Sequence, residues 1–300
     1  MGIFLKRIAL LLLFGTFLNC EDNGSKNGVT SNFVPENTSI VLKFSGNPDP
    51  STSFKNFSSA LKNNQLLSAC IKNKPYSDLW KKTALLKNLN PRETSLLCIS
   101  KVNDSTAHYT FITKVTSNLL NTDSILNATV DTLQIGKKSI QRIIIDKQVA
   151  YVSTQDSVFI ASSSQNLIED ILNRKPEKNL DFQKLLGIKS ESDFTAIIKG
   201  QDVQISDSTK VRFASWTNLN IAVLRDGISA TGVVLTRDSI PQLLSVFEGQ
   251  IPQQNDVASI VPAAALEARS LTFSDAEAFL FNLKKLNSTS RFENTSDLFG

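Results

Sequence analysis

One histidine and a run of serines are the residues that could supply catalysis. His108 is the only histidine, which excludes zinc sites that need two or three imidazoles. Ser162, Ser163 and Ser164 could provide the nucleophile of a serine hydrolase, with His108 as its base. However, the Gly-x-Ser-x-Gly motif that exposes such a serine is missing. We therefore predict no catalytic residue, and we expect the serines to cap the helix that follows them.

Two other patterns that could bind a phosphate or a metal are incomplete. Residues 136–139 resemble a phosphate loop, but Asp131 replaces the upstream glycine and Lys138 replaces the metal-binding serine or threonine. We expect a turn there. The carboxylates are scattered among polar residues, so we predict no acid–base pair, no metal site and no cofactor: Glu169, Asp170, Glu191, Asp193, Asp202 and Asp207.

The N-terminus carries an export signal that ends at a cysteine. Lys6 and Arg7 precede an apolar run of about 11 residues, which is shorter than the ~20 residues that a spanning helix needs. The segment 16–20 resembles a lipobox, so residues 1–19 are predicted to be a lipoprotein signal peptide and Cys20 the acylated residue. Ordinary secretion with an incidental cysteine is the alternative. Residues 20–32 are polar and contain glycine, as is typical of a flexible tether.

Charge and aromatic residues limit the partners. The formal net charge of +4 falls to +2 once Lys6 and Arg7 are removed with the signal, and no basic run is present. Nucleic acid is therefore not an expected partner. Trp80 and Trp216 could stack on a sugar or a peptide, although packing inside the protein is the commoner role of isolated tryptophans.

Cys70 and Cys98 could form a disulfide or remain two free thiols. Cys70 follows a helical pattern and Cys98 stands in an apolar strand pattern. In an oxidising compartment they could form a disulfide, but two buried thiols agree equally well with the sequence. Spacing alone does not decide between them.

The pattern of apolar residues predicts an α+β fold. Residues 139–163 contain three runs rich in Val, Ile, Tyr and Phe, separated by short polar breaks, which indicates an antiparallel meander. Arg225-Asp226-Gly227 indicates a hairpin between strands at 211–224 and 228–236. We expect a large, mainly antiparallel meander sheet in a module spanning 33–240, covered on one side by helices. Those helices are predicted near residues 54–66, 76–89, 122–128, 167–172 and 181–186.

A short segment near the C-terminus is similar in sequence to the beginning of the module. Ile260-Val261-Pro262 and the segment 269–274 repeat the order of Phe33-Val34-Pro35 and the strand at 39–44, and a helical pattern follows in both places. Residues 251–300 are therefore predicted to begin a second, incomplete module or to complete the first as a matching edge. Chance similarity between two short Val-Pro strands is the alternative.

These features together resemble a family. The Val34-Pro35 strand, the step from Phe159 through the serines into the helix at 167–172, and the restart at Val261 are similar to uncharacterised Bacteroidetes-type outer-membrane lipoproteins with tandem α+β modules of unknown function. The resemblance implies an outer-membrane location, and the acidic pair after Cys20 resembles the export signal of the surface-exposed members. It transfers no active residue.

The resemblance also points to modification sites. Six Asp-Ser or Asp-Thr pairs are similar to the O-glycosylation acceptors of such bacteria, although these pairs are also common in turns. The acceptors would be Ser105, Ser124, Thr132, Ser157, Ser208 and Ser239.

The function expected from the sequence is that of a lipid-anchored cell-envelope protein. Its body would be a binding or assembly module without enzymatic activity, with the membrane as one partner and an envelope protein or glycan as another. The alternative is an envelope hydrolase acting on glycan, peptide or ester, with a site assembled from distant residues. An assembly module of a longer surface protein is a third hypothesis.

Overall fold

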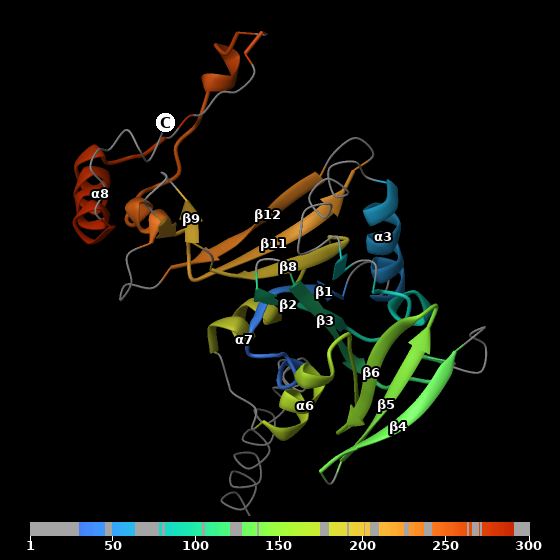
Figure 1. The fold of residues 1–300 in the computed structure, drawn as a ribbon. Coiled ribbons are helices and arrows are strands. Elements are labelled where there is room, and N and C mark those ends of the chain that lie inside the picture. Colours follow the sequence, from blue (N-terminus) through green and yellow to red (C-terminus); the bar gives the residue numbers. More distant parts are fainter. Residues whose placement is uncertain are drawn as a thin grey trace, which may run out of the picture.

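The dominant element is a single antiparallel sheet in which ten strands are described (Figure 1). The structure is a computed structural model that describes residues 30–45, 50–63, 78–79, 82–103, 106–120, 128–136, 138–174, 180–190, 192–200, 202–204, 210–224, 228–236, 242–262, 264–265, 270 and 272–290. The strand order is β12-β11-β8-β1-β2-β3-β7-β6-β5-β4, and β9 with β10 forms a separate pair. The bounds are β1 Thr38–Phe44, β2 Ser95–Asn103, β3 Thr106–Lys114, β4 Thr129–Ile135, β5 Lys138–Ile145, β6 Gln148–Gln155, β7 Val158–Ser162, β8 Phe194–Lys199, β9 Asp202–Gln204, β10 Lys210–Arg212, β11 Trp216–Val223 and β12 Ile228–Leu235.

The predicted α+β fold class is wrong, because strands outweigh helices. About 40% of the residues lie in strands and 26% in helices. The helix predicted at 76–89 is one source of the error, because residues 82–85 lie in turns and only the 3₁₀ helix η1 (Leu86–Asn88) follows them. Ala84, Leu85 and Leu86 are all buried, and three successive buried side chains do not fit one face of a surface helix. Strand β4 was not predicted at all.

The predicted covering of one side only is also wrong, because both faces of the sheet carry helices. Helix α3 (Pro50–Asn63) packs against β1 and β8, while α6 (Gln165–Asn173) packs against β6 and β7 and α7 (Leu180–Gly187) against β11. Successive residues of a strand point to opposite faces. In β1, Leu42 and Phe44 therefore join the apolar cluster under α3, whereas Val41 joins the cluster under α6 and α7.

The meander predicted at 139–163 is present as β5, β6 and β7. Adjacent strands pair without register shifts, and their turns are centred on Asp146-Lys147 and Asp156-Ser157. All four turn residues have positive φ, between 49° and 65°. Two successive residues with positive φ are typical of the tight hairpin turn whose twist matches that of the flanking strands.

Helix α7 is fixed to the sheet through its C-terminal carbonyl groups. The Lys43 ammonium group donates to the carbonyl oxygens of Leu186 at 2.6 Å and Ile188 at 3.0 Å. Asn218 Nδ2 donates to the Leu185 carbonyl at 3.0 Å. Lys43 is only 3% exposed, and burial lowers its pKa. A cation at the C-terminal end of a helix is favourable because the helix dipole is negative there.

The two faces of β11 differ in burial. Leu219, Ile221 and Val223 lie on one face, and Asn218 lies on the other. In the structure the three apolar side chains are only half-buried, whereas Asn218 is fully buried beneath α7. Its Nδ2 group is satisfied by the Leu185 carbonyl, whereas its buried Oδ1 has no hydrogen-bond partner among the described residues.

A small C-terminal unit follows the sheet. It contains η3 (Leu243–Phe247), η4 (Val257–Ser259) and α8 (Ala276–Ser290), and its buried cluster includes Phe279 and Leu283. The helix predicted after residues 269–274 is therefore present as α8, and Leu280 within it is 51% exposed. Residues 272–275 lie outside any strand. Within the described residues, no helix is long and apolar enough to cross a membrane.

Candidate functional site

His108 and one of the serines do meet. His108 lies in β3 and Ser163 directly follows β7, and these two strands pair in the sheet. The distance from His108 Nδ1 to Ser163 Oγ is 3.3 Å. Of the three serines that the sequence singled out, Ser163 is the one that the fold brings to the histidine.

The three serines nevertheless have structural roles: Ser162 and Ser163 form hydrogen bonds between the end of β7 and β3, and Ser164 caps α6. Ser163 Oγ accepts the backbone N–H of Tyr109 at 3.1 Å, and Ser162 Oγ donates to the Tyr109 carbonyl at 2.9 Å. Ser164 caps α6, as predicted, by accepting the N–H of Leu167. In the described part of the chain, no hydrogen bond joins His108 to a carboxylate that could orient it as a base. This geometry favours a structural role.

The charge state of His108 makes folding dependent on pH. Burial lowers its pKa below the ordinary value of 6.5, and the positive charge of Lys82 lowers it further, against an opposing hydrogen bond with Ser163. Because the folded protein binds this proton less tightly than the unfolded chain, the neutral histidine stabilises the fold fully above about pH 6.5. That stabilisation is lost as the pH falls from about 6.5 through the lower pKa of the folded state.

We therefore expect the urea midpoint of unfolding to decrease between pH 7.5 and pH 5.5, and to decrease less in His108→Asn. His108 is the only histidine, so the difference between the two proteins reports on this side chain. Equal pH dependence of both proteins would show that His108 is not the responsible group.

Of the cysteines, only Cys98 lies among the described residues. Its thiol is fully buried on the α6/α7 face of the sheet, and burial raises its pKa despite an opposing hydrogen bond with Thr38. Cys70, its predicted disulfide partner, and Cys20, the predicted lipid attachment site, lie outside the described residues. The disulfide and the lipid anchor remain predictions.

Two of the predicted O-glycosylation acceptors are described. Thr132 is exposed on β4, an edge strand, and Ser157 is exposed in the turn between β6 and β7. Both hydroxyl groups are therefore accessible to a modifying enzyme. The other four acceptors lie outside the described residues: Ser105, Ser124, Ser208 and Ser239.

The other sequence candidates do not converge. Gly136 lies in the turn between β4 and β5, as expected, with φ at 59°. Within the described ranges, no group of three or more His, Cys, Asp or Glu residues could hold a metal ion. Trp80 lies outside the described residues, whereas Trp216 is half-buried at the start of β11. Trp216 leads to a cavity that the sequence did not indicate.

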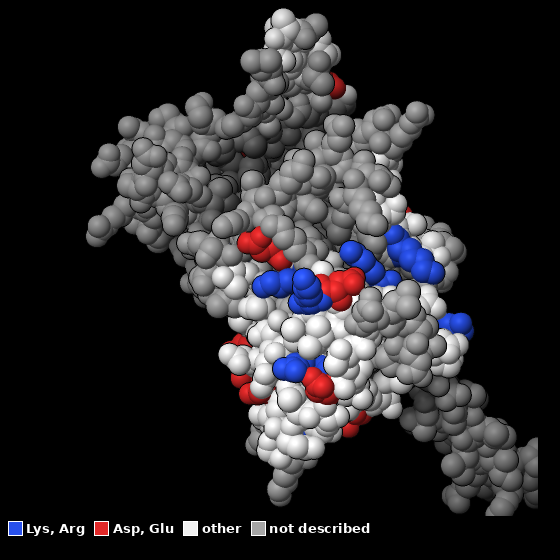
Figure 2. Space-filling model, turned by 45° about the vertical axis from the view of Figure 1, so that its right-hand side comes forward, with Lys and Arg blue, Asp and Glu red and all other residues white. Residues whose placement is uncertain are grey.

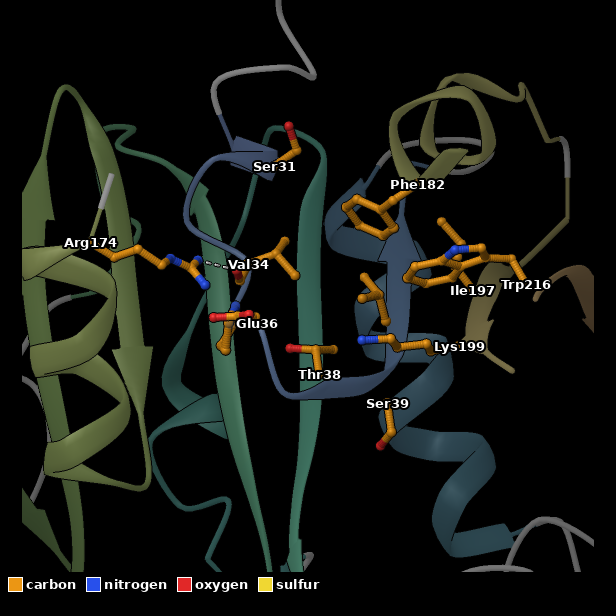
Figure 3. A pocket seen from close by; sticks show the side chains of 12 residues that line it. Ser31, Val34, Glu36, Thr38, Ser39, Arg174, Phe182, Ile197, Lys199 and Trp216 are labelled. Atoms are coloured by element: carbon orange, nitrogen blue, oxygen red, sulfur yellow. Dashed lines mark hydrogen bonds between the residues drawn. The ribbon is translucent and has the colours of Figure 1, made fainter. Parts of the chain in front are cut away.

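This cavity, the β1 pocket, lies beside the segment that enters β1 (Figure 3). Its volume is about 220 Å³. One wall is the chain segment from Ser31 to Ser39, and the opposite wall is apolar, with Phe182 from α7, Ile197 from β8 and Trp216 from β11. The rings of Phe182 and Trp216 are in contact, with centroids 5.6 Å apart at an angle of 38°. Phe182 is only 6% exposed and Trp216 is half-buried, so the indole is the more accessible of the two rings.

Three charged side chains stand at the rim of the β1 pocket. Arg174, which caps the C-terminus of α6, and Lys199, at the end of β8, approach from opposite sides, and Glu36 lies between them (Figure 3). Arg174 Nη2 donates to the Val34 carbonyl. No hydrogen bond or ion pair with another described residue is found for Lys199 or Glu36. Charged groups without partners in a concave site are available to a ligand.

A larger groove continues from the rim over α6. It has a volume of about 690 Å³ and shares Pro35, Glu36, Arg174 and Lys199 with the pocket. Its lining combines the polar Asn37, Asp170 and Asn173 with the apolar Leu167 and Ile171 of α6. The two cavities together can therefore receive a ligand that carries both apolar and polar groups.

Four residues that line the pocket were not predicted from the sequence: Glu36, Phe182, Arg174 and Lys199. They come from the segment before β1, two helices and β8, so no local pattern links them. Of the residues that line the pocket, only Trp216 had been identified from the sequence, as a side chain that could stack on a ligand.

The surface charge is mixed on the face that Figure 2 displays. Acidic and basic side chains of the described residues lie next to one another there, rather than in a field of one sign. Comparison with known proteins finds no matching family model, no similar curated protein and no similar solved structure.

Proposed function

We propose that this chain is a lipid-anchored cell-envelope protein without enzymatic activity, whose sheet body binds an envelope partner through the β1 pocket. The signal segment and Cys20 support the anchor. The resemblance to Bacteroidetes-type lipoproteins supports the outer membrane as its location. The structural role of Ser163 supports binding rather than hydrolysis.

The position of the pocket along the chain supports a partner near the membrane. Ser31 lines the pocket and follows Cys20 by only 11 positions. A fully extended chain of that length spans at most about 40 Å. An anchor at Cys20 would therefore keep the pocket within that distance of the lipid surface, where envelope molecules are concentrated.

The observation that carries the proposal is the composition of the pocket. An aromatic surface and a few converging charged groups are the features of a ligand site, whereas a structural cavity is apolar and closed. Trp216 is half-buried and Lys199 is exposed, so both are accessible to a partner.

The proposal can be tested with the full chain carrying Cys20→Ala, which cannot be acylated. We expect it to sediment with isolated cell envelopes, and Lys199→Glu in the same background to weaken this binding at least about tenfold. Lys184→Glu is the matched control, because Lys184 is an exposed lysine of α7 that lines neither cavity. Absence of sedimentation by the parent, or equal binding by all three proteins, would contradict the proposed function.

A further inference from the structure

We infer that the β1 pocket binds an acidic saccharide, with one sugar ring on the surface formed by Phe182 and Trp216 and its carboxylate or phosphate at Arg174 and Lys199. This inference rests on the proposed function and names the class of its ligand.

The rim of the pocket carries two cations and one carboxylate, that of Glu36, so its net positive charge of one can attract an anionic group. Lys199 is exposed and has no hydrogen bond or ion pair with another described residue, and Arg174 donates to Val34 through Nη2. A guanidinium group has five N–H donors, so most of those on Arg174 remain for a ligand. A carboxylate or phosphate beside either side chain would receive charge-assisted hydrogen bonds from it.

The aromatic surface requires a ring of limited size. A cavity of about 220 Å³ is smaller than the roughly 300–1,000 Å³ of sites that enclose drug-sized molecules. Tryptophan offers a flat apolar face on which the C–H face of a sugar can lie. Trp216 and Lys199 are directly opposite each other in the β11–β8 register, so a ring on the tryptophan would have its acidic substituent close to the ammonium group.

The outer groove favours a saccharide over an extended peptide. Asn37, Asp170 and Asn173 supply amide and carboxylate groups that can bind hydroxyl groups, and Glu36 can accept from hydroxyl groups at the rim. A peptide bound as an added strand needs an open sheet edge. The strands beside the pocket, β1, β8 and β11, each have strand neighbours on both sides, so none offers one.

The experiment measures binding of small probes to the full chain in detergent micelles by titration calorimetry. The probes are glucuronate, glucose 6-phosphate, glucose, acetate and the tripeptide Ala-Ala-Glu. We expect the two acidic sugars to bind at least about tenfold more tightly than glucose or acetate. Lys199→Gln should remove the preference for acidic sugars over glucose, whereas Lys184→Gln should keep it. Trp216→Leu should weaken binding of both acidic sugars.

Each other outcome overturns the inference. Equal binding of glucose and glucuronate would exclude the role of the cations, and tighter binding of the tripeptide would identify a peptide site. If no probe binds while envelope sedimentation still depends on Lys199, the saccharide is wrong and the proposed function stands. If that sedimentation is also absent, both are wrong.

Discussion

Replacing Phe44 with alanine is expected to lower the free energy of unfolding by about 3–5 kcal/mol. Phe44 is 0% exposed in the central strand β1. Its ring contacts Phe54 and Phe57 of α3, with centroids at 5.1 and 5.3 Å, and Phe194 of β8 at 6.1 Å. Truncation would leave a cavity between the sheet and α3, because neither partner can move into the space without losing its own contacts.

Urea unfolding followed by circular dichroism measures this effect. Phe281→Ala is the control, because Phe281 is 69% exposed on α8 and substitutions at exposed positions usually change stability by less than about 0.5 kcal/mol. Similar losses in the two variants would mean that α3 does not pack on β1 as described.

The meander of β5, β6 and β7 and the pair of β11 and β12 could be predicted because their signals are local. Both consist of β-branched and aromatic runs separated by short polar segments. The faces of the sheet were more difficult, because periodicity does not say what covers each face. One sequence signal did indicate covering on both faces: four of the five residues of β7 (Val158–Ser162) are apolar, as is typical of a strand buried on both sides. All five are buried in the structure.

The candidate site could not be predicted, because it depends on contacts between distant segments. Glu36, Arg174 and Lys199 are separated by many positions and meet only because β1 pairs with β8 while α6 ends beside the segment that enters β1. The contact between His108 and Ser163 likewise follows from the pairing of β3 with β7. In both cases the sequence shows the residue types, but the distances between them in space depend on the fold.

The second large effect is expected at Cys20. A signal peptide that is cleaved before an acylated cysteine leaves the body attached through buried acyl chains, each contributing about 0.8 kcal/mol per CH₂ group. Two or more chains provide stable anchoring, whereas one chain provides only reversible binding. We propose the Cys20 thiol as the attachment point, so Cys20→Ala should abolish this contribution completely. Binding through the β1 pocket would then be the only remaining link to the envelope.

The measurement that tests the central claim most directly is fractionation of cells that express the wild-type chain, Cys20→Ala, or Cys20→Ala combined with Lys199→Glu. We expect the wild-type chain in the membrane pellet even after a high-salt wash and Cys20→Ala in the pellet only at low salt. The double variant should be soluble throughout. Retention of Cys20→Ala in the pellet after the high-salt wash would contradict the lipid anchor, and equal distribution of the single and double variants at low salt would contradict binding through the β1 pocket.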